Sequence, residues 1–211
     1  MVRPEIEEID IVIDRIVDIN KGIAKFWSRA EGWAPAKAAK LLSKSRLDWQ
    51  TSLSKTLKIW LADSNFHSDE KSGRLILAWV NLGSLVEGTL KLFLSIYYKD
   101  YIKDIHVITK GKNGKLIDPD VLNLGRMRQF LFEKERISKV SQRTETILDK
   151  KWNKWIKLIQ ERRNVIHAYQ DKNIGDFEEF SKNVRNYLVF LEDINSRLIY
   201  PDDNIYDPDD I

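Results

Sequence analysis

Apolar residues recur every three or four positions along almost the whole chain, which is the spacing of one face of an α-helix. Alternating apolar and polar runs between turn residues, which would indicate strands, are nearly absent. The pattern therefore predicts an all-α fold, a bundle of five to six helices. We expect residues 1–200 to form a single helical-bundle domain and residues 201–211 to form an acidic C-terminal tail.

Two helices are predicted in the N-terminal part of the chain. The first begins at Pro4 and ends before Trp33. The second has Pro35 in its first turn, where proline is well tolerated, and continues to about residue 62. The polar segment 63–73 then predicts a loop.

The segment 74–102 is apolar on nearly all sides for about seven turns, which is typical of a helix at the centre of a bundle. Glu87 lies within it at an inward position, so its carboxylate either has a polar partner or faces a site. Residues 105–117 combine β-branched residues with Gly111 and Gly114. They predict either a small hairpin or a loop.

Three further helices are predicted toward the C-terminus. The first follows Asp118, an N-cap residue ahead of a proline, and ends near residue 139. The second runs from Ile147 toward Tyr169, and the third is capped by Asp176 and ends before the acidic tail. No internal repeat is present.

The charge of the chain is unevenly distributed. The net charge is +3, and the last eleven residues hold five Asp and no basic residue, so residues 1–200 carry +8. This surplus suits a polyanionic partner and equally suits solubility alone. The tail is either a disordered end or an arm on the basic face of the body.

Composition excludes several kinds of site. The chain has no Cys, which rules out disulfides, thiolate metal sites and a cysteine nucleophile, and we expect a cytoplasmic protein. Its three histidines lie in separate segments and form no metal-binding motif, so we expect no metal and no cofactor: His67, His106 and His167. An acidic N-terminus and the lack of an uninterrupted apolar run predict neither a signal peptide nor a membrane span.

One local cluster carries groups suited to phosphoryl chemistry. Within the nine residues ERRNVIHAY lie two guanidiniums, an amide, an imidazole and a phenol. Arginine presents a permanent charge and a planar fork to a phosphate, and histidine moves a proton near neutral pH. This combination needs no metal.

Arg162 and His167 form an Arg-x4-His pair, which Tyr169 extends to Arg-x4-His-x-Tyr. This segment resembles the HEPN family of small α-helical bundles, whose active members carry an Arg-x(4–6)-His motif. The extended form is similar to HEPN toxins paired with minimal nucleotidyltransferase antitoxins, in which the tyrosine can be adenylylated. On this resemblance, residues 72–198 form a HEPN-like core and residues 1–62 an N-terminal helical extension.

The resemblance implies a metal-independent endoribonuclease of a toxin or antiphage-defence system, in which the RNA 2′-hydroxyl attacks the adjacent phosphate. It also implies a homodimer, RNA as the substrate and a nucleotidyltransferase-type antitoxin. Arg162 would hold the scissile phosphate, and His167 would transfer the proton. Three further residues would support the site or bind RNA: Arg163, Asn164 and Glu87. Tyr169 would line the cleft or be a modification site.

At about 100° per residue, Arg162 and His167 lie about 140° apart on a regular helix, so one undistorted helix does not aim both at one point. Either a cleft between two copies or a helix that is distorted or terminated would solve this.

Other interpretations of the segment remain open. In a structural interpretation, Arg162 and Arg163 pair with Glu161 or with the acidic last helix, and His167 is a satisfied interface residue. The protein would then be either a structural helical bundle with a Trp-rich oligomeric surface or a non-catalytic HEPN-like module. Such a module would bind a nucleotide, RNA or a partner protein.

Overall fold

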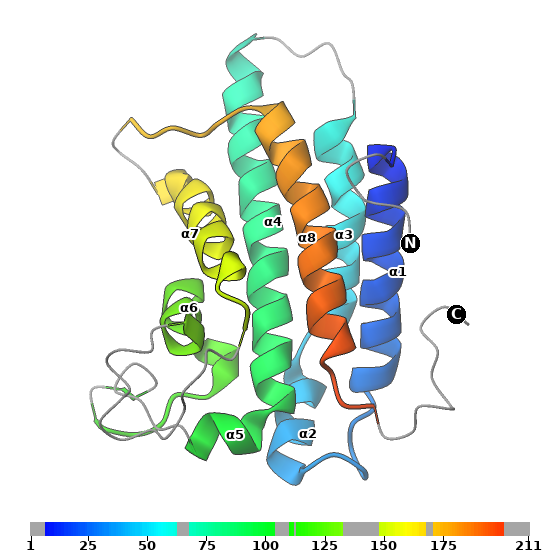
Figure 1. The fold of residues 1–211 in the computed structure, drawn as a ribbon, viewed down its shortest axis with the longest axis vertical. Coiled ribbons are helices and arrows are strands. Elements are labelled where there is room, and N and C mark those ends of the chain that lie inside the picture. Colours follow the sequence, from blue (N-terminus) through cyan, green and yellow to red (C-terminus); the bar gives the residue numbers. More distant parts are fainter. Residues whose placement is uncertain are drawn as a thin grey trace.

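The computed structural model describes residues 7–62, 68–103, 110–111, 113–132, 148–167 and 171–200. Within these ranges every regular element is helical, and no β-strand is found (Figure 1). The predicted all-α helical bundle is therefore confirmed.

The described ranges contain eight α-helices and two short 3-10 helices. In chain order they are α1 (Ile9–Trp27), α2 (Ala36–Lys44), α3 (Leu47–Leu61), α4 (Ser68–Ile96), α5 (Tyr98–Lys103), η2 (Pro119–Val121), α6 (Leu124–Phe132), α7 (Lys151–Arg163), η3 (Asn164–His167) and α8 (Phe177–Ser196). Four of them, α1, α3, α4 and α8, run along the long axis of the molecule, and α7 and α6 flank α4 on one side (Figure 1).

The helix α4 is central to the packing. It contacts α3, α7 and α8, and α1 covers α3 and α8 from the other side. Buried side chains from all these helices form one core, which includes the fully buried Ile13, Trp79, Ile159 and Tyr187. The helices of the first 62 residues share this core with the later ones.

The central position of α4 explains its apolar character. By length and composition, Glu70–Ile96 is long and apolar enough to cross a membrane. However, 61% of the most apolar stretch of this helix is buried inside the bundle. The core helix of a bundle can be equally long and apolar, so α4 does not by itself indicate a membrane span.

The helix predicted from Pro35 to about residue 62 is divided into α2 and α3. Ser45 takes an extended backbone conformation, with φ −69° and ψ 140°, and its hydroxyl donates to the Leu42 carbonyl at 2.5 Å. Such a side-chain bond competes with the helical backbone pattern. The break lets α2 contact α4 while α3 packs against α1 and α4.

The apolar segment 74–102 is also divided, into α4 and α5. The chain turns at Tyr97, whose hydroxyl donates to the carbonyl oxygen of Arg197 beyond α8, so a tertiary contact holds the turn. The helix α4 begins at Ser68, and it therefore includes part of the predicted loop 63–73.

Between α5 and α6, the described part of segment 105–117 contains a single antiparallel bridge between Lys110 and Leu116. Gly114 lies in the turn with φ +71°, a conformation that favours glycine. The segment therefore forms a tight turn, while residues 105–109 and 112 of the predicted hairpin or loop lie outside the described residues.

The helix predicted after Asp118 is realised as the short η2 followed by α6, which ends at Phe132. Residues 133–147 lie outside the described ranges, as does the acidic tail 201–211. The next predicted helix is α7, which begins at Lys151.

The prediction for the last helix is confirmed in detail. The Asp176 carboxylate accepts a hydrogen bond from the Glu179 backbone N–H at 2.7 Å, as an N-cap residue does. The helix α8 then continues to Ser196.

Candidate functional site

The α-helical part of the motif segment ends between its arginines and its histidine. Arg162 and Arg163 form the last turn of α7, and Asn164–His167 continue as the 3-10 helix η3. The C-terminal end of a helix carries a partial negative charge, which favours basic side chains there. The helix therefore changes its geometry at the point where a regular α-helix would separate Arg162 and His167.

Arg162 is directed toward α8. Its Nη2 donates to Glu179 Oε1 at 2.9 Å and to Oε2 at 3.0 Å, and its Nε lies 3.3 Å from Oε1. Its Nη1 donates to the carbonyl oxygen of Asn173 in the segment that precedes α8. Only 12% of the side chain is exposed. Arg162 thus connects the end of α7 to α8 and to the loop before it.

Gly175 allows this ion pair to lie close to the backbone. Its φ is +69°, and a β-carbon at this position would overlap the Glu179 carboxylate and lie 3.5 Å from Arg162 Nη2. The same loop is attached to α4 through Trp79, whose Nε1 donates to the Ile174 carbonyl at 2.8 Å. The guanidinium of Arg162 is therefore held in a fixed orientation.

Arg163 is directed the other way, toward α4. Its Nη1 donates to Glu87, and Lys91 shares the same carboxylate at 2.8 Å. Its aliphatic stem lies against Gly83, where a β-carbon would come within 2.6 Å of Arg163 Cδ and 2.9 Å of its Cβ. The absence of a side chain at Gly83 thus permits the close approach of α7 to α4.

Glu87 has polar partners at its inward position. Burial disfavours the charge on its carboxylate, but hydrogen bonds from Lys91 and Arg163 outweigh this effect and lower the pKa of Glu87. The carboxylate therefore stays ionised between two cations. The sequence left open whether Glu87 has a polar partner or faces a site, and the structure shows two polar partners.

His167 and Asn164 are exposed at the end of the segment. Among the residues that the structure describes, neither side chain has a hydrogen-bond partner. Tyr169, the last residue of the predicted motif, lies outside the described ranges. The histidine is thus available to a ligand.

The two arginines are directed toward different helices, Arg162 toward α8 and Arg163 toward α4. Arg162 pairs with the acidic last helix, as the structural interpretation states. Glu161 does not bind it, and its Oε1 lies 3.6 Å from Lys157 Nζ. Arg163 keeps more freedom, since 30% of its side chain is exposed and one of its five N–H groups donates to Glu87. Arg163 is therefore the more accessible of the two motif guanidiniums.

The sequence did not identify the residues that hold the two arginines in place: Glu179, Gly175, Lys91 and Gly83. One signal for Glu179 was present, because Asp176 and Glu179 have the three-residue spacing of a capping box. In that motif the glutamate reaches back to the N-cap backbone, whereas here it binds Arg162. A local pattern therefore located the side chain but not its partner.

The solvent-facing side of α7 is basic. The helix contains five basic residues and one acidic residue. Four exposed lysines precede the motif on or next to this helix: Lys150, Lys151, Lys154 and Lys157. In the described ranges, no group of three or more His, Asp or Glu side chains is placed to hold a metal ion.

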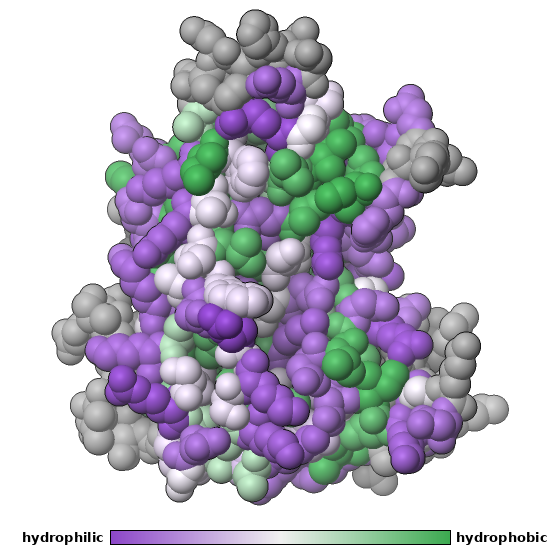
Figure 2. All heavy atoms as spheres, turned by 180° about the vertical axis from the view of Figure 1, so that it is seen from behind, coloured by the Kyte–Doolittle hydropathy of each residue, from purple (hydrophilic) through white to green (hydrophobic). Residues whose placement is uncertain are grey.

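Exposed apolar side chains lie on the other side of the motif. Leu77 of α4 and Ile166 of η3 are 47% and 46% exposed, and η3 packs against α4. Figure 2 shows hydrophobic surface gathered over the upper part of α4, next to the end of α7. The motif segment therefore follows a basic helix face and includes an exposed apolar residue next to α4.

No family model, curated protein or solved structure matches the chain.

Proposed function

We propose that the protein is a HEPN-like, metal-independent endoribonuclease of a toxin–antitoxin or antiphage-defence system. The observation that carries the proposal is the segment at the end of α7, in which two ordered arginines are followed by His167, exposed and without a partner in the described part of the chain. The resemblance of RRNVIHAY to the HEPN motif segment gives this arrangement its chemical interpretation. Tyr169 would then be the residue that a nucleotidyltransferase-type antitoxin modifies.

The proposed reaction is an internal phosphoryl transfer. The RNA 2′-oxygen forms a bond to the adjacent phosphorus, the bond from phosphorus to the 5′-oxygen breaks, and a 2′,3′-cyclic phosphate results. His167 takes the proton of the 2′-hydroxyl or supplies one to the leaving 5′-oxygen. A guanidinium stabilises the charge that develops on the phosphoryl oxygens, and the exposure of Arg163 suits this role. The orientation of Arg162 by Glu179 suits a role in positioning the segment.

A second copy of the chain would supply the other proton-transfer group. One chain presents one exposed motif histidine, whereas the reaction needs both a base and an acid. The apolar surface with Leu77 and Ile166 lies beside His167, where a twofold contact would bring two such histidines together. This arrangement supports a homodimer with a shared cleft.

The basic face of α7 supports RNA as the substrate. Lys150 and Lys154 are exposed and have no ion-pair partner among the described residues, and Lys157 lies 3.6 Å from Glu161. Lysines on one helix face can follow a phosphate backbone without reading its sequence. RNA held there would be guided along α7 toward His167.

Cleavage of RNA in the presence of EDTA tests the proposal. We expect the wild-type protein to leave cyclic-phosphate ends and His167→Ala to lose cleavage while retaining its circular-dichroism spectrum, because this side chain is exposed. Lys21→Ala, on the exposed surface of α1, is the matched control and should cleave normally. Undiminished cleavage by His167→Ala would overturn the assignment.

A non-catalytic HEPN-like binding module is the second candidate. It is favoured by the engagement of Arg162, whose guanidinium already binds Glu179 and the Asn173 carbonyl. A module of this kind would bind RNA or a nucleotide with measurable affinity and leave it intact. Saturable RNA binding without cleavage, by protein that is unmodified at Tyr169, would favour this candidate.

A further inference from the structure

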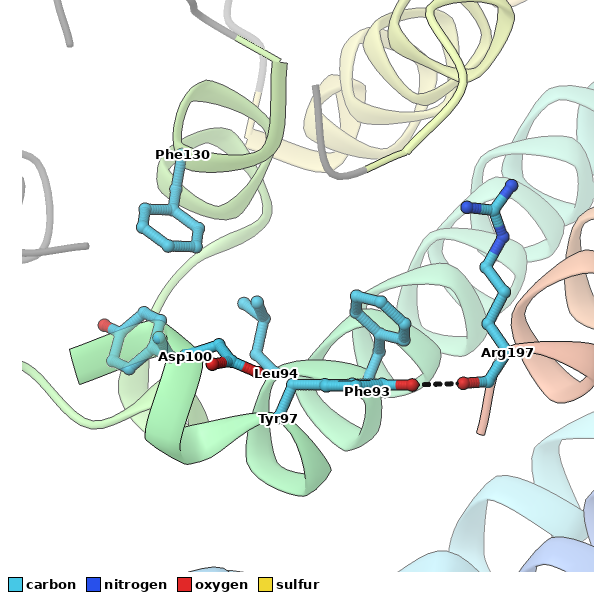
Figure 3. Close-up of a pocket in the computed structure, with 7 residues that line it drawn as sticks. Phe93, Leu94, Tyr97, Asp100, Phe130 and Arg197 are labelled. Carbon is cyan, nitrogen blue, oxygen red and sulfur yellow. Dashed lines mark hydrogen bonds between the residues drawn. The ribbon is translucent and has the colours of Figure 1, made fainter. Parts of the chain in front are cut away.

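A cavity of about 380 Å³ lies near the end of the bundle, apart from the motif segment (Figure 3). It is formed by the end of α4, by α5 and α6, and by the residue that follows α8. Its walls consist of Phe93, Leu94, Tyr97, Asp100, Tyr101, Phe130 and Arg197. A cavity of this size lies in the range of sites for small ligands.

The aromatic walls of the cavity are held in place by tertiary contacts. The Tyr97 hydroxyl donates to the Arg197 carbonyl, and the Tyr101 hydroxyl donates to the Ile117 carbonyl at 2.5 Å. The rings of Phe93 and Tyr97 have centroids 4.9 Å apart, and those of Tyr101 and Phe130 are 5.1 Å apart. Tyr97 is partly exposed, whereas Phe93, Tyr101 and Phe130 are 4%, 2% and 1% exposed. A ligand ring would therefore meet mainly Tyr97, which the buried rings hold in a preformed position at little cost in ordering.

The two charged residues of the cavity stand on opposite sides of this surface. Figure 3 shows Asp100 on one side of Leu94 and Phe93 and the guanidinium of Arg197 on the other. Arg197 donates through Nε and Nη2 to Asp193, at 3.1 and 3.0 Å, which leaves three of its five N–H groups for another acceptor. The Asp100 carboxylate is largely exposed and 3.4 Å from Lys103, so it also has acceptor capacity left.

We infer that this cavity binds a nucleoside monophosphate unit, with the base against the aromatic walls, the exocyclic amine of the base toward Asp100 and the phosphate toward Arg197. In a nucleotide such as AMP, the aromatic ring lies between an exocyclic amine and a phosphate. This order matches the cavity, in which the aromatic walls lie between the Asp100 carboxylate and the Arg197 guanidinium. An aromatic amino acid carries both its charges at one end and does not match that order. Base stacking on aromatic side chains and arginine contacts to phosphate are both strong terms in nucleotide recognition.

The unit is either a free mononucleotide or one nucleotide of an RNA chain, and the second source rests on the proposed function. Phe93, which lines the cavity, lies six positions after Glu87, which binds Arg163, and this corresponds to about 9 Å along the axis of α4. A single strand that occupies the motif could therefore place a neighbouring nucleotide in the cavity.

Equilibrium binding of AMP, adenosine and UMP to the full-length protein tests the inference without any need for cleavage. AMP should bind saturably and about tenfold more tightly than adenosine, because Arg197 contacts the phosphate. UMP lacks the exocyclic amine and should bind more weakly than AMP. No saturable binding of AMP at millimolar concentration would overturn the inference.

Two exposed side chains allow the site to be mapped in folded protein. Arg197→Gln should abolish the preference for AMP over adenosine, and Asp100→Asn should reduce the preference for AMP over UMP. Lys21→Gln and Asp18→Asn, which remove a positive and a negative charge from the exposed surface of α1, are the matched controls and should bind as wild type. AMP binding that is unchanged in both cavity variants would place the nucleotide elsewhere and contradict the inference.

Competition with a short single-stranded RNA identifies the source of the nucleotide. Displacement of AMP by the RNA would show that the cavity holds part of the substrate, and simultaneous binding would show a separate mononucleotide site. His167→Ala should bind AMP as wild type does, because this residue lies outside the cavity. A protein that binds AMP in this way but never cleaves RNA would contradict the proposed function and leave the nucleotide site standing.

Discussion

Glu179 holds Arg162 through both oxygens of its carboxylate, at 2.9 and 3.0 Å from the same guanidinium nitrogen. This pair joins the last turn of α7 to the first turn of α8, across the segment that contains η3. Because 12% of the Arg162 side chain and 29% of the Glu179 side chain are exposed, solvent screens the pair less than it would screen a surface ion pair. Arg162 therefore stabilises the contact between α7 and α8, in addition to any role it has in catalysis.

Replacement of Glu179 measures how much this ion pair contributes to the free energy of unfolding. Glu179→Gln should lower the free energy of unfolding by about 1–2 kcal/mol, because Arg162 loses a charged acceptor in a partly buried position. Glu178→Gln is the matched control, since it removes an acid from the same first turn of α8 on an exposed side chain, and it should change stability by less than about 0.5 kcal/mol. Urea unfolding of the three proteins checks this, and equal effects of the two substitutions would contradict it.

Two of the three glycines of α4, Gly83 and Gly73, should respond in opposite directions to alanine. A β-carbon at Gly83 meets the Arg163 stem at 2.6 Å and its Cβ at 2.9 Å, so Gly83→Ala should push α7 outward and cost about 1–3 kcal/mol. A β-carbon at Gly73 has no neighbour within 4 Å, so Gly73→Ala should stabilise the same helix by about 0.5–1 kcal/mol. Thermal unfolding of both variants checks the signs, and a stabilised Gly83→Ala protein would show that α7 is not tightly seated on α4.

Much of this fold could be predicted because helix periodicity and capping are local. Asp176 was identified as an N-cap from its position before an apolar run, and its carboxylate does accept the bond that defines the cap. The division of the helix after Pro35 was missed because the deciding bond, from Ser45 to the Leu42 carbonyl, competes with a pattern that otherwise continues. The turn at Tyr97 depends on Arg197, a hundred residues later, and has no local signal.

The site was predictable only in part, for the same reason. The residues of the motif segment could be selected by chemistry, but their partners come from other helices, Glu179 from α8 and Glu87 from α4. The sequence could state that Glu87 needs a partner, since an inward carboxylate is costly without one. It could not state that Arg163 rather than Arg162 would provide it. The role of each motif residue in catalysis stays a prediction.

The lowered pKa of Glu87 predicts a pH dependence of stability. A carboxylate whose pKa is lower in the folded than in the unfolded protein stabilises the fold above the unfolded pKa, of about 4.3, and loses this contribution as the pH falls toward the folded pKa. The wild type should therefore be more stable than Glu87→Gln at neutral pH, and the difference should shrink below about pH 4.3.

Urea unfolding between neutral and acidic pH measures this difference. Glu161→Gln serves as the control, because it removes a carboxylate from an exposed position of α7, and it should stay within about 0.5 kcal/mol of wild type. A difference between wild type and Glu87→Gln that is constant over the whole pH range would show that the ion pairs with Arg163 and Lys91 do not favour the ionised carboxylate.

The basic face of α7 predicts how RNA binding depends on salt. The logarithm of the RNA affinity falls linearly with the logarithm of the salt concentration. Each lysine that contacts a phosphate of single-stranded RNA contributes about 0.7 to the steepness of this slope. Replacement of Lys154 by Gln should therefore weaken binding at low salt and reduce the slope by about this amount, with a similar effect for Lys150. Lys21→Gln removes a charge from α1 and should leave the slope unchanged. Titrations of His167→Ala protein, which is not expected to cut the RNA, would measure the slopes. Equal slopes in all variants would mean that RNA does not follow α7 and would contradict the proposed path of the strand toward His167.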